Sequence, residues 1–250
     1  MNARDPAAFA HAPVGAPFDL HAQQPIGQIA VQLPGATAVF RRLKLDFCCG
    51  GQVSLAQAAA DKGLDAGAVV AELAQLQRGA ALPQAGAGAS ALIDLIVTRY
   101  HEVHRGQLPE LVRMARRVEA VHRSHPAVPT GLADALEAMH AELLEHMGKE
   151  ESVIFPLLRA GGNPFVGTPI GVMRAEHTDH GAALERLNAL THDTTPPADA
   201  CTTWKALYAG IAQLADDLIS HIHLENNVLF PPFEAQAGAA GCASTQCGCH

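Results

Sequence analysis

Two segments of the chain place a histidine four residues before a glutamate, and nearly identical apolar residues follow both. The first runs from His146 through Glu150 into VIFP, and the second from His221 through Glu225 into VLFP. On a helix, residues four apart lie one turn above each other on the same face. A single such pair would fit a hydrogen-bonded pair on a helix surface. The repeat instead favours a dinuclear metal site, in which each carboxylate bridges two ions and each histidine binds one of them.

Histidines elsewhere in the chain are candidates for the remaining ligands. His101 and His122 are 21 residues apart, which is about 31 Å along a continuous helix, so they cannot both serve one site. Counted from the turn expected near residue 127, His101 is level with His146 and Glu150, whereas His122 is level with the start of the next helix. We therefore expect His101 to be a ligand, with His104 as a reserve.

A further helix carries His177 and His180, one turn apart, and the residues alone leave both open as ligands. His223 follows His221 by two residues, which turns it about 200° away on a helix, so we expect it not to bind. Two Glu-x-x-His pairs would suit a ferritin-like iron site, but they lack the matching flanks of the first two segments. These pairs are Glu119/His122 and Glu137/His140.

Four long helical patterns must position these side chains, over about 90–123, 130–159, 169–191 and 197–234. Helices of this length joined by short loops predict an all-α protein with an antiparallel four-helix bundle over 90–235. A smaller helical domain is expected before it, at 24–80, with Ser54 capping one helix and Gly63 ending it. The remaining segments are a flexible leader at 1–23, a linker at 81–89 and a Cys-rich tail at 236–250.

Composition limits the partners of the chain. The net charge of −8 argues against non-specific binding of nucleic acid. No stretch approaches the roughly 20 apolar residues that span a bilayer, and the first residues do not resemble a secretory signal. We therefore expect a cytoplasmic protein without a membrane partner, whose cysteines stay mostly reduced.

Two adjacent cysteines, Cys48 and Cys49, lie in the segment DFCCGG at 46–51. Neighbouring cysteines form an intramolecular disulfide only with strained geometry. The segment therefore suggests thiol or redox chemistry, transfer of a metal ion, or a mixed disulfide that would link a homodimer. Two small buried residues before a turn are the plainer interpretation. The tail holds four more residues that would suit a soft metal ion or have no function: Cys242, Cys247, Cys249 and His250.

The repeated His-x3-Glu helices, with single histidines on the other two, resemble the hemerythrin-like fold. DFCCGG resembles the N-terminal domain of the iron–sulfur cluster repair di-iron proteins, and RYHEVHRGQLPEL, CTTWKALY and HIHLENNVLFP extend the likeness over about 24–234. The resemblance implies two iron ions in an oxo-bridged di-iron centre. The ligands that it implies are His101, His146, Glu150, His177, His221 and Glu225.

The resemblance also implies a function. Proteins of this family are cytoplasmic and stress-induced, and they help to restore iron–sulfur clusters damaged by nitric oxide or peroxide. The implied partners are damaged iron–sulfur proteins, with nitric oxide or O2 as a small ligand. The alternative is a protein that binds or scavenges nitric oxide, or a di-iron nitric-oxide reductase, with no delivery to clusters. Because the linker at 81–89 is rich in glycine and alanine, we also expect the small domain to move and the bundle to load iron without it.

Overall fold

The computed structural model of the chain describes residues 20–33, 35–77 and 88–235. These residues form helices and turns, which confirms the predicted all-α class, and one isolated bridge pairs Pro25 with Ser54. Among the helices described, none combines the length and the apolar character that crossing a membrane requires. The tail residues suggested for a soft metal ion, Cys242, Cys247, Cys249 and His250, lie outside the described residues, as does most of the expected linker.

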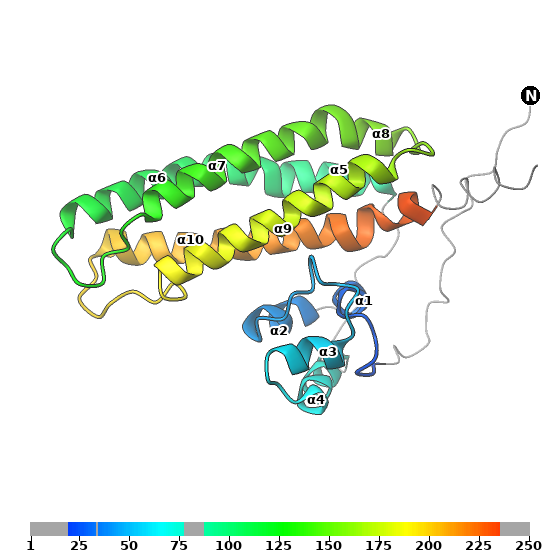
Figure 1. Ribbon diagram of the computed structural model, residues 1–250, viewed down its shortest axis with the longest axis horizontal. Helices are drawn as coiled ribbons and strands as arrows, with labels where there is room; N and C mark the ends of the chain where they lie inside the picture. Colours follow the sequence, from blue (N-terminus) through cyan, green and yellow to red (C-terminus); the bar gives the residue numbers. More distant parts are fainter. Residues whose placement is uncertain (1–19, 34, 78–87, 236–250) are drawn as a thin grey trace, which may run out of the picture.

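Four long helices make the bundle, and each packs against two neighbours (Figure 1). Their limits lie within a few residues of those predicted from the sequence. The first bundle helix comprises α5 (Ala89–Ile96), η1 (Val97–His101) and α6 (Glu102–Val121), and the second comprises α7 (Leu132–Lys149), η2 (Glu150–Ile154) and α8 (Phe155–Arg159). The third is α9 (Gly167–Leu190), and the fourth comprises α10 (Thr202–Leu224) and η3 (Glu225–Leu229).

Three of the bundle helices contain one π-helical turn each, and the sequence did not predict these turns. The turn η1 ends at His101, η2 begins at Glu150 and η3 begins at Glu225. A π turn adds a residue to the local α-helical repeat and is frequent at functional sites. Each of the three turns therefore adjusts the helix where it carries a candidate metal ligand.

The buried histidines and glutamates of the bundle lie between two apolar clusters. Along the first bundle helix, Ile96 belongs to one cluster and Leu108 to the other, with His101 between them. Along the fourth, Leu218 and Leu229 flank Glu225 in the same way. Burial of each large apolar side chain contributes roughly 1.5–3 kcal/mol, which offsets the cost of enclosing polar groups. The polar layer is thus closed to water at both ends.

The N-terminal module, residues 20–77, is a small helical unit with its own apolar core. The hydroxyl of Ser54 accepts a hydrogen bond from the backbone N–H of Gln57, and Gly63 has a positive φ of 67° after the helix, as predicted. Its core includes Ile26, Phe40 and Leu73. Its helices are α1 (Ile26–Gln32), α2 (Ala36–Arg42), α3 (Leu55–Asp61) and α4 (Ala66–Gln77).

The module packs against the α9 and α10 side of the bundle (Figure 1). Arg41 forms an ion pair with Asp216 at 3.0 Å, and Lys44 forms one with Asp193 at 2.9 Å. Asn227 of η3 also donates hydrogen bonds to backbone carbonyls of the module. Specific polar contacts thus join the module to the bundle in this structure, and movement of the module on its linker stays a prediction.

Candidate metal centre

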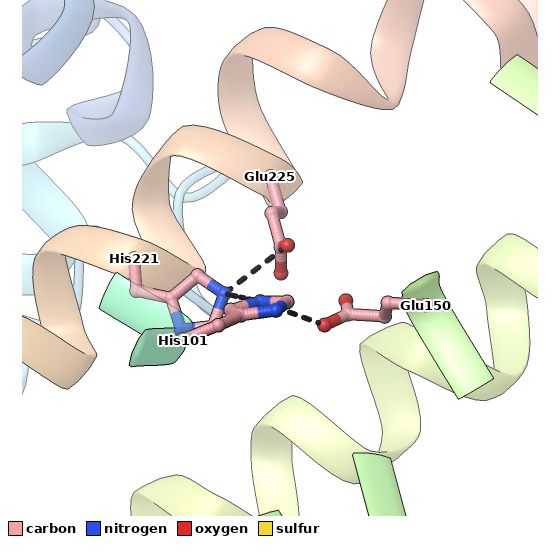
Figure 2. Close-up of side chains that lie close together, drawn as sticks. All are labelled: His101, Glu150, His221 and Glu225. Atoms are coloured by element: carbon pink, nitrogen blue, oxygen red, sulfur yellow. Dashed lines mark hydrogen bonds and ion pairs between the residues drawn. The ribbon is translucent and has the colours of Figure 1, made fainter. Parts of the chain in front are cut away.

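Four histidines and two glutamates from all four bundle helices converge in the polar layer. Each is almost completely buried. The structure brings them together as two overlapping groups, and within each group the candidate ligand atoms lie within 4.8 Å of one another. One group is His101, Glu150, His221 and Glu225 (Figure 2), and the other is His146, Glu150, His177 and Glu225.

The carboxylate of Glu150 extends between histidines of the two groups. Its Oε2 lies 3.3 Å from Nε2 of His101, and its Oε1 lies 3.3 Å from Nε2 of His146. Among the described residues, neither oxygen has a hydrogen bond of suitable geometry, although both are buried. A buried carboxylate without a compensating partner is costly. A pair of cations, one beside each oxygen, would provide that compensation.

Glu225 takes the equivalent position from the opposite side. Its Oε1 lies 3.2 Å from Nε2 of His221, and its Oε2 lies 3.0 Å from Nε2 of His177. Burial would raise the pKa of Glu225, but the two imidazoles outweigh it and hold this pKa well below its usual range. Glu225 is therefore an anion at neutral pH, and both glutamates are placed to bridge two metal positions.

The imidazole nitrogens are spaced as ligands of a common ion would be. Nε2 of His101 lies 3.1 Å from Nε2 of His221, and the corresponding distance between His146 and His177 is also 3.1 Å. Two nitrogens about 2.1 Å from one ion lie about 3.0 Å apart at a right angle and about 3.4 Å apart at a tetrahedral angle. The residues present thus fit two metal ions with nitrogen and oxygen ligands.

Two of the histidines are oriented by carboxylates on neighbouring helices. Nδ1 of His101 lies 2.7 Å from Glu151, and Nδ1 of His146 lies 2.7 Å from Glu176. A carboxylate at Nδ1 fixes the proton there and leaves Nε2 free for a metal. Burial would lower the pKa of His146, but Glu150 and the other nearby carboxylates raise it to about 9. Proton and metal therefore compete for this side chain.

The other two histidines lack a carboxylate at Nδ1. His177 donates from Nδ1 to the side-chain oxygen of Asn226 at 2.9 Å. Nδ1 of His221 is buried and has no hydrogen-bond partner in the part of the chain that the structure describes, and the ring of Tyr100 stacks on His221 at 5.5 Å between centroids. The two ligand groups therefore have unequal outer support. Among the described residues, Nδ1 of His177 bonds to the amide of Asn226, whereas Nδ1 of His221 bonds to no side chain.

Sequence reasoning did not identify Glu151, Glu176 and Asn226. A usable signal was present, because each is adjacent in sequence to a candidate ligand. A residue next to a ligand is rotated about 100° around its helix, so its side chain can reach the histidine of a neighbouring helix. Which neighbour it reaches depends on the packing of the bundle.

The reserve candidates His104 and His180 lie beside the ligand groups but do not belong to them. The ring of His104 is 5.6 Å from that of His221, and the ring of His180 is 4.8 Å from that of His146. Burial lowers the pKa of both to about 3, so both are neutral. Their ring nitrogens have no hydrogen-bond partner among the described residues. Both therefore lie next to the two ligand groups and outside them.

The cysteine pair of the module lies at the edge of this centre. Sγ of Cys49 is 3.6 Å from the backbone oxygen of His177, and the backbone oxygen of Cys48 accepts a hydrogen bond from Asn226 at 3.0 Å. Cys48 is buried and Cys49 is half-buried. On the same side, His223 packs against Phe47 rather than toward the ligands. Cys49 therefore contacts a member of the histidine–glutamate cluster directly, and Cys48 is linked to the cluster through Asn226.

Comparison with known proteins agrees with this geometry. The sequence profile described as hemerythrin HHE cation binding domain matches residues 92–233, and a domain of unknown function (DUF542) matches residues 22–77. Proteins named iron-sulfur cluster repair protein YtfE are similar over 83% of this chain and 95% of their own length. The identity is 49% for Citrobacter koseri, 47% for Dickeya chrysanthemi and 48% for Escherichia coli. The chain belongs to the hemerythrin HHE cation-binding family and is a homologue of these repair proteins.

Proposed function

We propose that this chain repairs iron–sulfur clusters damaged by nitrosative or oxidative stress, and that iron held in its bundle is what it supplies. The observation that carries the proposal is the pair of ligand groups that share Glu150 and Glu225 in a closed polar layer. The names of its relatives support the same function. The proposal places the chain in the cytoplasm, where thiols such as Cys48 and Cys49 stay reduced.

The six side chains would hold two iron ions, which form an oxo-bridged pair when oxidised. Each ion would have two imidazole nitrogens and two bridging carboxylates, so an octahedral ion would keep positions for small ligands such as nitric oxide or O2. The first ion would be held by His101 and His221, and the second by His146 and His177.

The residues around the centre suit storage and release of ferrous ion. Neutral imidazoles and carboxylates hold iron without thiolate, whereas cluster assembly needs iron on sulfur ligands. An acceptor with sulfur ligands can therefore withdraw iron from this site. The apolar clusters on both sides exclude water from the layer, so iron would not exchange freely with the solvent.

The proposal is tested by anaerobic incubation of the 57Fe-loaded protein with an iron–sulfur protein whose cluster nitric oxide has damaged. We expect recovery of the acceptor's cluster, with 57Fe incorporated into it. Nitric oxide consumption and N2O are measured in the same samples. Steady production of N2O without transfer of 57Fe would instead identify a nitric-oxide reductase. A chain purified from iron-supplied cells with zinc and no iron would contradict the proposal altogether.

A further inference from the structure

Three side chains of the module form a second cluster of metal-binding type, outside the six-residue centre. Asp46, Cys48 and Cys49 each offer a ligand atom, and these atoms lie within 4.8 Å of one another. Sγ of Cys48 is 3.7 Å from Sγ of Cys49 and 3.3 Å from Oδ1 of Asp46. The carboxylate belongs to an exposed residue, so the cluster faces solvent on one side.

These distances are close to the edges of a tetrahedral metal site. With metal–sulfur bonds of about 2.3 Å and a metal–oxygen bond of about 2.1 Å, two sulfurs lie about 3.8 Å apart and a sulfur and an oxygen about 3.6 Å apart. The sulfur atoms of Cys48 and Cys49 thus need little movement to bind one ion. Two soft ligands and one carboxylate suit a ferrous, cobalt or zinc ion and leave one position open.

The loop is folded so that it holds these groups in place. Asp46 accepts hydrogen bonds from the backbone N–H groups of Cys49 and Gly50, at 2.9 and 3.0 Å. A Cβ atom at Gly50 would lie 2.9 Å from the backbone oxygen of Asp46, and one at Gly51 would lie 2.9 Å from the backbone oxygen of Phe47. Glycine is therefore required at both positions. The motif DFCCGG encodes a tight turn that presents an acid and two thiols.

The same loop touches the bundle at a ligand of the iron centre. His177 directs its ring into the centre, while its backbone oxygen lies 3.6 Å from Sγ of Cys49. Asn226 links the two sites from the other side, because it bonds both to the ring of His177 and to the backbone of Cys48. The thiol cluster therefore lies between the iron centre and the solvent.

We propose that Asp46, Cys48 and Cys49 form a mononuclear site for ferrous ion in transit between the iron centre and an acceptor protein. This inference rests on the proposed function. Binding of one ferrous ion breaks its bonds to the nitrogen and oxygen ligands of the iron centre, releases the two thiol protons to solvent, and forms two iron–sulfur bonds and one iron–oxygen bond. The iron stays ferrous throughout, so no oxidant or reductant is needed. Transfer to the acceptor's sulfur ligands breaks these three bonds, and the thiols take up two protons again.

Cobalt(II) serves as the probe, because thiolate ligands give it a charge-transfer absorption that nitrogen and oxygen ligands do not. The full-length chain, with its centre loaded with iron and Cys242, Cys247 and Cys249 replaced by serine, is titrated with Co(II) under anaerobic conditions. We expect one additional Co(II) per chain with the thiolate band. Cys48→Ser with Cys49→Ser should abolish the band.

Asp46→Asn retains a side-chain oxygen for the loop but loses the charged ligand. It should weaken Co(II) binding at least about tenfold. Removing a residue that only supports a ligand already lowers metal affinity by about that factor, and Asp46 is proposed to bind the ion directly. If the double variant folds poorly, Cys49→Ser alone, at a half-buried position, takes its place and should reduce the band. Cys201→Ser, at an exposed cysteine outside the cluster, is the matched control and should leave the titration unchanged.

Iron content measured before each titration separates this inference from the proposed function. A chain that loads iron but shows no thiolate band, or a band that survives Cys48→Ser with Cys49→Ser, would overturn the thiol site and leave the centre standing. Equal Co(II) affinity for Asp46→Asn and the parent would also overturn the three-ligand site. Failure to load iron would count against the proposed function instead.

Discussion

Asn226 accepts a hydrogen bond from Nδ1 of His177 at 2.9 Å, and the other end of the same amide donates to the backbone oxygen of Cys48 at 3.0 Å. The loop of the N-terminal module thereby holds the amide that orients one candidate metal ligand. Outer partners of this kind fix the tautomer and the ring orientation of a metal-binding histidine. The module thus contacts an outer partner of one candidate ligand, so we expect it to help support the centre.

Asn226→Ala is expected to weaken retention of iron by about 10- to 100-fold, the usual effect of losing an outer partner. Asn227→Ala is the matched control, because Asn227 also bonds to the module but touches none of the six candidate ligands. Iron per chain is measured after dialysis against graded concentrations of a chelator. Equal losses from both variants would show that docking of the module, and not the bond to His177, supports the site.

Replacement of a bridging glutamate should be more severe than replacement of a neighbouring histidine. Glu150→Gln and Glu225→Gln each remove a charge shared by both metal positions, so both ions should be lost. His104→Ala and His122→Ala should retain iron, since His104 lies outside the ligand groups and His122 packs against Trp204 far along the helix. Metal analysis of the purified variants distinguishes these outcomes. An empty centre in His122→Ala with a full one in Glu150→Gln would refute the assignment.

The affinity of the chain for ferrous ion should rise with pH from about 6.5 to 9. The nearby carboxylates raise the pKa of His146 to about 9 in the metal-free chain, so an entering ion must displace a proton at neutral pH. This pKa is raised on folding. The proton on His146 therefore stabilises the metal-free fold below pH 6.5, and that stabilisation is lost as pH rises through about 9. Anaerobic competition with a chelator at several pH values measures the affinity, and a constant value would contradict this expectation.

The local sequence was enough to predict the bundle and part of its centre. The His-x3-Glu repeat places two candidate ligands on one face of a helix by periodicity alone. The number of residues between each histidine and the turn near residue 127 was enough to favour His101 over His122. His177 and His180 could not be separated in this way, because both are buried and one turn apart. Here the resemblance to a known family implied His177, and the structure places His177 in a ligand group and His180 beside it.

Contacts between helices were not predictable from the sequence. The π turns follow no marked local preference, and they become visible only where the helices pack around the polar layer. The partners of Nδ1 depend on which side chain of a neighbouring helix arrives at that point. The position of the module depends on interactions across more than a hundred residues, such as that of Asn226 with Cys48. Periodicity within one helix carries no information about these distances.

The two metal positions should lose iron at different rates. At the first, His101 is supported by Glu151, but Nδ1 of His221 has no partner. At the second, both histidines have one, Glu176 for His146 and Asn226 for His177. We therefore expect biphasic removal of ferrous ion by a chelator, with the first position emptied in the fast phase.

Two matched variants assign the phases, because each removes the charge of one outer carboxylate. Glu151→Gln, beside His101, should accelerate the fast phase and leave the slow phase unchanged. Glu176→Gln, beside His146, should accelerate the slow phase. Both glutamates also pair with a basic residue, Arg105 or Lys149, so the general electrostatic change is similar. Stopped-flow detection of the iron–chelator complex gives both rates. If Glu176→Gln accelerates the fast phase instead, the position supported by Asn226 is the more labile one, and the unpartnered nitrogen of His221 does not set the order of release.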